Sequence, residues 1–273
     1  MRNTAGGGYC VNVSVANVHA RPGFASEVVT QALMGEKVVE LEAETNWIRI
    51  RQWDGYEGWI HRFFLTGANG QFSEGIASGG SCVVDDLFGQ VHEERTPSSP
   101  VLRDLVYGDE LVVLDRKREW TRVLLPDGES GWTVARQAPR VSGDVRKYVT
   151  RLALRFLGVQ YLWGGKSPKG FDCSGFAQTV MKSVVPLPRD ARDQAEDPHL
   201  VAVDLGDAKE GDLIFFSLEG DEVDHVAVFL GGDRFVHCSG FVKVESFDRN
   251  SRDYNDRLRR GLDRAKSIER VCR

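Results

Sequence analysis

The sequence predicts a multidomain protein in which two small all-β modules precede one α+β domain. Two observations support this prediction. The first half of the 273-residue chain repeats itself at a fixed offset, and the second half changes to helices followed by strands. We therefore divide the chain into residues 1–70, 71–140 and 141–273.

The repeat is anchored by glycine and tryptophan pairs that lie 73 positions apart. The pairs are Gly35 with Gly108, Trp47 with Trp120, Gly58 with Gly131, and Trp59 with Trp132. Each copy alternates short β-branched and aromatic runs with Gly, Asp and Pro turn signals, as in "WIRIRQWDGYEGWI". This alternation is typical of small all-β modules.

The Gly-Trp pair near the end of each copy, with another tryptophan twelve residues earlier, resembles the bacterial SH3-like barrel. The resemblance implies two barrels of five to seven strands, a module common in cell-wall proteins, with most tryptophans packing in the barrels. The copies differ where Tyr56 corresponds to Glu129 and Glu27 to Pro100. Any function of Tyr56 and Glu27 is therefore expected in the first module only.

The segment "QAPRVSGDV" at residues 137–145 is the predicted boundary before the third part, because it contains Pro, Ser and Gly. A helical period then continues from Val145 to Phe156, with Asp144 as the N-cap and Gly158 as the stop. Further along, apolar runs predict strands at 212–217, 225–230 and 234–239. Helices followed by a run of strands indicate an α+β domain.

The segment "GFDCSGFAQTVMKS" at residues 170–183 places Cys173 at the start of a predicted helix. Apolar residues recur at the spacing of one helical face up to Val184, and Pro186 ends the run. In the first turn, unpaired N–H groups and the macrodipole favour a thiolate over a thiol. Cys173 can equally extend the apolar face as packing, so its position alone leaves both interpretations open.

A nucleophilic cysteine needs a base within reach and a group that orients the base. In the last domain, His225 and His237 lie on predicted strands that are joined by the turn "GGD". A three-residue loop would pair Leu230 with Arg234 and bring both histidines to one face. A two-residue loop would place them on opposite faces. Cys238, next to His237, is expected to point away from such a site and to serve as packing.

The composition is that of an ordinary soluble protein, with 41% hydrophobic residues, 27% charged residues and a net charge of −5. This charge gives no footprint for nucleic acid, and no stretch approaches the roughly 18 apolar residues of a membrane span. The five cysteines lack C-x-x-C spacing, so neither a disulfide framework nor a zinc site is indicated. With no signal-peptide pattern visible, the chain as written is expected to be cytoplasmic, or exported if a leader was removed.

Sequence blocks across residues 145–273 resemble the NlpC/P60 cysteine peptidase family. In chain order the blocks are "YLWGG", "DCSGF", "PRDARDQ", "GDLIFF", "HVAVFLG" and "FVHCSG". The resemblance implies a papain-like fold in which Cys173 is the nucleophile, His225 the base and His237 the third, orienting residue. Tyr161 matches a tyrosine that lies beside the nucleophile. No metal and no organic cofactor is implied.

Two SH3-like modules before such a domain resemble the subgroup of γ-D-glutamyl-L-diamino acid endopeptidases, which act on cell-wall peptides. In that subgroup an acid and a tyrosine from an SH3-like module, with the aspartate before the nucleophile, hold the free amine of an N-terminal L-alanine. The resemblance gives these roles to Glu27, Tyr56 and Asp172, although Asp172 can also be a helix N-cap. Ser174 is expected to be a further substrate contact. The subgroup's serine after "PRD" is Ala191 here.

The expected reaction is attack of a Cys173 thiolate, held by the helix start and by protonated His225, on the γ-amide carbonyl carbon of D-glutamate. The backbone N–H of Cys173 and the Tyr161 hydroxyl would meet the oxyanion. The expected partner is a murein peptide. Alternatives are an amidase or acyltransferase with the same pair, an exported hydrolase of intact peptidoglycan stems, and a wall-binding SH3-like scaffold with a weak amidase domain.

Overall fold

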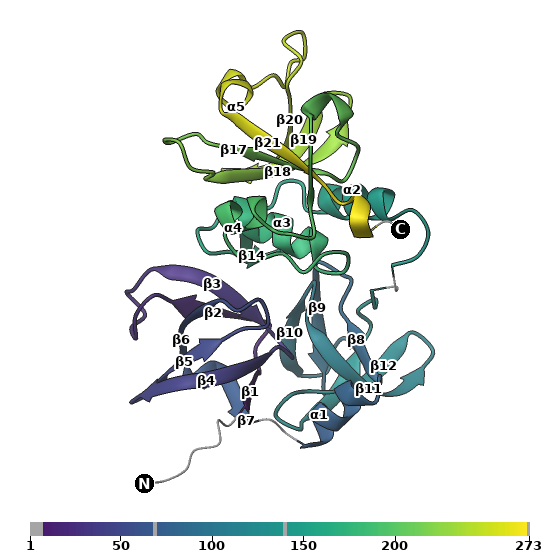
Figure 1. Ribbon diagram of the computed structural model, residues 1–273. Coiled ribbons are helices and arrows are strands. Elements are labelled where there is room, and N and C mark those ends of the chain that lie inside the picture. The colour runs from purple at the N-terminus through teal and green to yellow at the C-terminus, as the bar shows by residue number, and fades with distance from the viewer. Residues whose placement is uncertain (1–7, 68–69, 139–140, 272–273) are drawn as a thin grey trace. The chain divides into compact units, whose positions relative to one another are not determined.

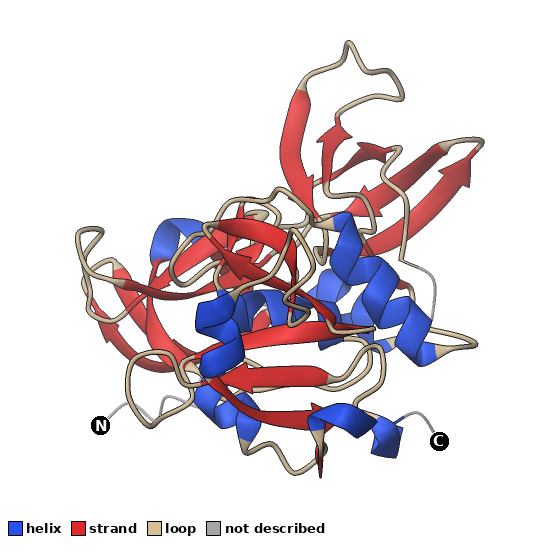
Figure 2. Cartoon of the chain, turned by 90° about the horizontal axis from the view of Figure 1, so that it is seen from above, coloured by secondary structure: helices blue, strands red, loops and turns tan. Residues whose placement is uncertain are grey.

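The computed structural model describes residues 8–67, 70–138 and 141–271. The chain divides into two compact units, residues 1–139 and 140–273. Strands make up most of the first unit, and helices accompany the sheet of the second, as Figure 1 and Figure 2 show. No helix in the described ranges is both long and apolar enough to cross a membrane.

The first sheet of the first unit has seven strands in the order β3-β2-β6-β5-β4-β1-β7. Its strand pairs are antiparallel throughout the described residues. A 3-10 turn at Arg62–Phe64 precedes the last strand. The strands are β1 (Gly8–Val11), β2 (Val15–His19), β3 (Val28–Leu33), β4 (Lys37–Glu44), β5 (Trp47–Arg51), β6 (Glu57–His61) and β7 (Leu65–Gly67).

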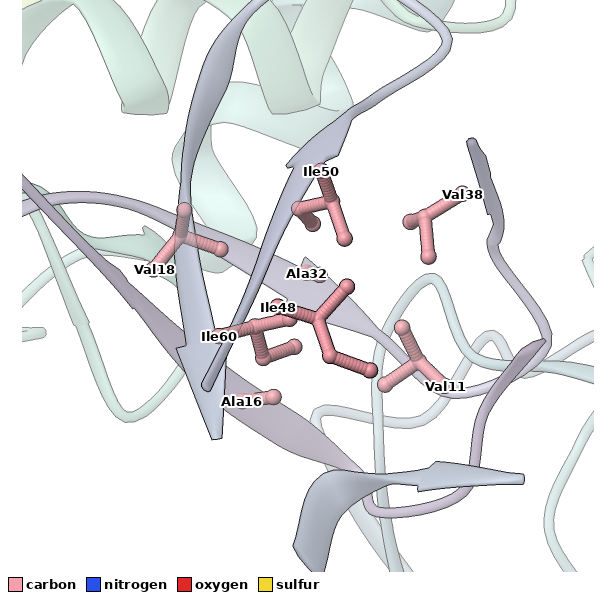
Figure 3. Packing of buried hydrophobic residues seen from close by; sticks show 8 residues of the cluster. All are labelled: Val11, Ala16, Val18, Ala32, Val38, Ile48, Ile50 and Ile60. Atoms are coloured by element: carbon pink, nitrogen blue, oxygen red, sulfur yellow. The ribbon is translucent and has the colours of Figure 1, made fainter. Parts of the chain in front are cut away.

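Alternating apolar residues of these strands form one core, which Figure 3 shows from close by. On β5, Ile48 and Ile50 are fully buried while Arg49 between them is exposed. Side chains two positions apart lie on the same face of a strand, so "WIRIR" buries one face of β5. The buried members of the cluster are Val11, Ala16, Val18, Ala32, Val38, Ile48, Ile50 and Ile60.

The second sheet has six strands in the order β10-β9-β13-β12-β11-β8 and follows helix α1 (Gly70–Ala77). Placing β8–β13 over β1–β6 gives the same strand order in both sheets. The offset of the sequence repeat is therefore also an offset between structurally equivalent strands. The strands are β8 (Ser81–Val83), β9 (Phe88–His92), β10 (Val101–Val106), β11 (Glu110–Lys117), β12 (Trp120–Leu124) and β13 (Ser130–Thr133).

Contacts inside the first unit join its two sheets. Met34 packs in the core of the second sheet, and its backbone N–H donates to a carboxylate oxygen of Asp109 at 3.2 Å. At the neighbouring turn, Gly35 has a φ of +86°, and a Cβ there would lie 2.5 Å from the carbonyl oxygen of Glu110. Glycine is therefore required where the two repeats touch.

The second unit has one six-stranded antiparallel sheet in the order β16-β21-β17-β18-β19-β20, with a short β14-β15 pair. The helices are α2 (Val145–Arg155), α3 (Cys173–Met181), α4 (Ala191–Ala195) and α5 (Asp256–Arg260), with 3-10 turns at Leu205–Asp207 and Glu269–Val271. The strands are β14 (Lys166–Ser167), β15 (Gly170–Phe171), β16 (Val201–Val203), β17 (Leu213–Phe216), β18 (His225–Gly231), β19 (Arg234–Ser239), β20 (Phe241–Ser246) and β21 (Leu262–Ser267).

Both predicted helices are present at the predicted starts. Asp144 caps α2 by accepting hydrogen bonds from the backbone N–H groups of its first turn, and Gly158 adopts a φ of +85° beyond the helix end. Helix α3 begins at Cys173 and ends at Met181. Its apolar stripe is fully buried, but Val184, which the pattern assigned to the same face, lies beyond the last helical residue.

Candidate active site

Cys173 is the first residue of α3, and its side chain lies against the backbone at the start of β18. The thiol approaches the Asp224 carbonyl oxygen at 3.8 Å and accepts a hydrogen bond from the backbone N–H of Val226. These two backbone groups stand on either side of His225. The fold therefore brings the predicted nucleophile to the residue that was predicted as its base.

The turn between β18 and β19 differs from the three-residue loop that was considered. Gly231 pairs with Arg234, so the expected pairing of Leu230 with Arg234 is wrong. The loop contains two residues, Gly232 and Asp233, both with positive φ, which is the geometry of a tight hairpin turn. A β-bulge between Phe229 and Gly231 inserts one extra residue, which restores the register that a longer loop would have given.

Because of this bulge, His225 and His237 face the same side of the sheet. His225 Nε2 and His237 Nδ1 are 2.7 Å apart, and the two ring planes are nearly perpendicular. Both residues are buried, and His237 is only 1% exposed. Toward the histidines, the last pair of the β18–β19 ladder is Val228 with Val236. His225 and His237 therefore lie just beyond the end of this ladder.

A third residue, which the sequence reasoning missed, continues this chain of hydrogen bonds. Glu245 on β20 lies 2.9 Å from His237, with its Oε2 facing Nε2 of the ring. Burial alone would raise the pKa of Glu245, but hydrogen bonds from His237, Lys243 and Asn255 outweigh it and lower the pKa to about 2. The only sequence signal was an acidic residue in "FVKVES", the run that follows His237.

Electrostatics favours neutral forms of the Cys173 and His225 pair in the unliganded site. Burial raises the pKa of the Cys173 thiol to about 12, and the charge of Asp172 acts in the same direction. Burial lowers the pKa of His225 to about 3, with the neighbouring His237 adding to the effect. The position at the helix start predicts a thiolate, but desolvation opposes it, because burial disfavours both the Cys173 thiolate and the His225 imidazolium.

Asp172 is the N-cap of α3, which confirms the interpretation of this residue as a helix cap. Its carboxylate accepts hydrogen bonds from the backbone N–H groups of Gly175 (2.6 Å) and Gly164 (3.0 Å), and both of its oxygens accept from the Arg189 guanidinium. The Ser174 hydroxyl joins this network, 3.3 Å from Asp172 and 2.8 Å from Arg189. Substrate contacts by Asp172 and Ser174 stay predictions. Such contacts would use side-chain oxygens that already form hydrogen bonds within the protein.

Tyr161 lies beside the nucleophile, as predicted. Its side chain is half-buried, and the pKa of its hydroxyl is raised by burial and by the proximity of Cys173 and Asp172, so the hydroxyl is a hydrogen-bond donor at neutral pH. The backbone of Tyr161 is fixed by a 2.8 Å hydrogen bond to the Gly240 carbonyl. Cys238 is fully buried and donates to the carbonyl oxygen of Phe171, which agrees with its predicted packing role.

Glu27 and Tyr56 belong to the other unit. Glu27 directly precedes β3, and its carbonyl accepts from the backbone N–H of Ala20 just after β2. Tyr56 directly precedes β6, which pairs antiparallel with β2. The two residues therefore lie at the same end of the first sheet, and their predicted roles toward a substrate remain untested.

Comparisons with known proteins agree with this geometry. The family profile described as NlpC/P60 family matches residues 158–260, and that of a bacterial SH3 domain matches residues 14–66. The chain is 30% identical over 230 residues to a gamma-D-glutamyl-L-lysine dipeptidyl-peptidase of Bacillus cereus, covering 78% of this chain and 68% of that protein. It is also 30% identical over 264 residues to dipeptidyl-peptidase 6 of Lysinibacillus sphaericus, covering 89% and 93%.

The fold has a close counterpart among solved structures. The crystal structure of an NlpC/P60 family protein from Bacillus cereus ATCC 10987 superimposes with a TM-score of 0.80 at 23% identity, covering 96% of this chain and 99% of that chain. The similarity thus extends over both units as well as over the residues around Cys173. Taken with the relatives that match along most of their length, it shows that the chain belongs to the NlpC/P60 family of cysteine peptidases.

Proposed function

We propose that this peptidase hydrolyses the γ-D-glutamyl bond to the diamino acid in murein peptides of the form L-Ala-γ-D-Glu-diamino acid. The observation that carries the proposal is the thiol of Cys173 in contact with the backbone groups that flank His225, whose ring is in turn hydrogen-bonded to His237. The name of the Bacillus cereus relative, gamma-D-glutamyl-L-lysine dipeptidyl-peptidase, supports the choice of bond.

The neutral resting pair leads to a general-base reaction. As the Cys173 sulfur attacks the γ-carbonyl carbon of D-glutamate, the thiol proton passes to His225. The bond to the diamino acid nitrogen then breaks, His225 gives its proton to that nitrogen, and a thioester remains. Water attacks the thioester, one of its protons passes to His225, and the departing sulfur recovers that proton as the dipeptide leaves.

Hydrogen-bond donors near the nucleophile are suited to the negative charge that develops on the carbonyl oxygen. The backbone N–H of Cys173 is at the start of α3, and the Tyr161 hydroxyl is protonated beside it. Removing one such donor typically costs about 10²- to 10³-fold in rate. A Tyr161→Phe variant should therefore lose turnover within this range while retaining its fold.

The proposal also includes two features of the fold, a second SH3-like module and a papain-like second unit. The second sheet is a second SH3-like module, because its strand order repeats that of the first sheet, of which residues 14–66 match the bacterial SH3 domain. The second unit is papain-like, because a helix that begins with cysteine packs at an antiparallel sheet that carries both histidines.

Product identification tests the proposed reaction. Purified protein is incubated with L-Ala-γ-D-Glu-diaminopimelate and with the lysine form, and products are identified by mass. We expect the L-Ala-γ-D-Glu dipeptide and the free diamino acid, and we expect neither from Cys173→Ala. Cleavage of the L-Ala bond, release of ammonia only, or unchanged cleavage by Cys173→Ala would each refute the assignment.

A further inference from the structure

Glu245 is hydrogen-bonded to His237 and takes no part in the proton transfers of the proposed reaction. Its Oε2 faces Nε2 of His237 at 2.9 Å and accepts a 2.7 Å hydrogen bond from the Asn255 side chain. Its Oε1 lies 3.1 Å from the ammonium of Lys243. The Glu245 side chain is only 15% exposed, so three partners from two elements and a loop hold it in one place.

The ionised carboxylate determines where the ring protons lie. A carboxylate without a proton can only accept hydrogen bonds, so its contact requires a proton on Nε2 of His237. With a single ring proton, on Nε2, His237 has a lone pair on Nδ1, which can accept the 2.7 Å hydrogen bond from Nε2 of His225. The single ring proton of neutral His225 is therefore on Nε2, and its Nδ1 carries the lone pair.

We propose that Glu245 is a positioning residue that sets the tautomers of both histidines, so that His225 offers Nδ1 as its basic atom to the thiol of Cys173. The inference rests on the proposed function for the role of Cys173 as the nucleophile. In the attack step, the proton of the sulfur moves to Nδ1 of His225, and the protons on the two Nε2 atoms stay where they are.

The charges around His225 agree with this role. Protonation of His225 places a positive charge in a buried site, and the charge of Glu245 raises the pKa of His225. Lys243 on β20 and Arg257 on α5 lower it. Glu245 thus offsets neighbouring positive charges at the moment when His225 holds the thiol proton.

A purely structural role is the competing explanation, because Glu245 also forms an ion pair with Lys243. The two roles predict different results for the histidine nitrogens. Loss of the ion pair in Lys243→Gln leaves the contact of Glu245 with His237 in place, so the tautomers should not change. Loss of the carboxylate in Glu245→Leu removes the only hydrogen-bond acceptor that the described part of the chain places at Nε2 of His237.

The experiment reads the tautomers directly in the full-length protein. With ¹⁵N-labelled histidine, a two-bond ¹H–¹⁵N correlation spectrum distinguishes protonated from bare ring nitrogens. The signals of interest are identified by their loss in His225→Gln and His237→Gln. The wild-type protein should show both rings protonated at Nε2 and bare at Nδ1, and Lys243→Gln should show the same pattern.

In Glu245→Leu, the ring of His237 should become a mixture of tautomers. By analogy with the outer hydrogen-bond partners of metal-bound histidines, kcat/KM should fall by about 10- to 100-fold. Glu245→Gln keeps an acceptor oxygen and should retain the wild-type pattern with a smaller loss. Glu196→Gln, which breaks an exposed ion pair with Arg264, is the matched control and should change neither readout.

Two results would overturn the proposal. One is a wild-type pattern in Glu245→Leu, whatever its activity, and the other is a wild-type protein in which Nδ1 of His237 carries the proton. The spectra need no substrate, so this failure is distinguishable from failure of the proposed function. If the spectra agree but no murein peptide is cleaved, only the substrate assignment is wrong.

Discussion

At the scale of single residues, burial decides the ionisation state of the site. A cysteine at a helix start normally has a depressed pKa, yet Cys173 is nine-tenths buried and lies next to the carboxylate of Asp172. Its partner His225 is equally buried, and burial penalises the imidazolium as well. The reaction therefore begins from two neutral groups, and charge separates only when a substrate carbonyl is present.

His237 should tolerate polar replacements. It accepts a hydrogen bond from Nε2 of His225, and the side-chain oxygen of Asn or Gln can accept the same bond. We expect measurable turnover in His237→Asn and His237→Gln, and a loss in His237→Leu toward the 10²- to 10⁴-fold that general-base catalysis typically contributes. Steady-state kinetics on the tripeptide, with circular dichroism to check folding, measures this. Equal activities of the Asn and Leu variants would mean that His237 only packs.

The buried neutral His225 should make stability depend on pH. Its pKa is about 3 in the folded protein and near 6.5 when unfolded, so below pH 6.5 the unfolded chain binds a proton that the folded chain does not. This stability is fully present above pH 6.5 and decreases as the pH falls. From pH 6.5 to 5 the loss approaches about 2 kcal/mol for one such group.

Urea unfolding at pH 7 and pH 5 measures the effect, and His225→Gln is the comparison because all other titrating groups remain. Glu245 does not contribute in this window, because its unfolded pKa is 4.5 and its folded pKa is about 2. The variant should lose less stability than the wild type between the two pH values. Identical losses would show that His225 is not held neutral in the folded protein.

At the scale of elements, the start of α3 depends on a buried ion pair. Arg189, 1% exposed, reaches both oxygens of Asp172, which also caps the helix. Helix α4 adds to this support through Gln194, whose amide donates to the carbonyl oxygens of Ser174 and Pro188. The start of α3, and with it the nucleophile, is thus positioned by contacts between residues 15 to 20 positions apart in sequence.

Removing one member of the Asp172 and Arg189 pair should be costly. Arg189→Met leaves a buried carboxylate with a reduced set of donors, a loss of about 3 to 5 kcal/mol in the free energy of unfolding. Asp172→Asn alone leaves the guanidinium buried, and it should destabilise similarly. In the double variant neither charge is left alone, so its loss should be clearly smaller than the sum of the two single losses. Additive losses would show that the pair is not coupled.

Several elements could be read from the sequence, and others could not, for physical reasons. Helices α2 and α3 and strands β17 to β19 follow from periodicity and caps, which are local properties. The bulge before Gly231 could not be predicted, because two loop lengths gave opposite faces and only packing selects between them. Arg189 and Glu245 act on Asp172 and His237, which lie elsewhere in the chain. No regular sequence spacing links either residue to its partner.

At the scale of the whole molecule, the repeat has a consequence for function. The two sheets share their strand order, yet Glu27 and Tyr56 have counterparts of different chemistry in the second copy, Pro100 and Glu129. The resemblance to peptidases of this subgroup assigns Glu27 and Tyr56 to the amine of the substrate, and the positions were found by aligning the copies.

Selectivity for a free N-terminus tests that assignment. Acetylation of the L-alanine amine removes the charge that Glu27 would pair with, while Asp172 keeps its ion pair with Arg189. For an exposed carboxylate such as Glu27, the lost ion pair costs up to about 1 kcal/mol, or about fivefold in kcat/KM. We expect this ratio between free and N-acetylated L-Ala-γ-D-Glu-diaminopimelate, and a smaller ratio in a Glu27→Gln, Tyr56→Phe double variant. Glu44→Gln, an exposed residue of the same sheet, is the control. Comparable kcat/KM for both peptides would refute the selectivity.

The central claim is that Cys173 forms a thioester with the γ-carbonyl of D-glutamate, and trapping that intermediate tests it most directly. The protein is mixed with L-Ala-γ-D-Glu-diaminopimelate, quenched in acid within one turnover and analysed by intact and peptide mass spectrometry. We predict a mass increase equal to one L-Ala-γ-D-Glu acyl group, located on the peptide that contains Cys173 and absent in Cys173→Ala. Turnover by Cys173→Ala, or an acyl adduct on a residue of the wild-type protein other than Cys173, would contradict the account.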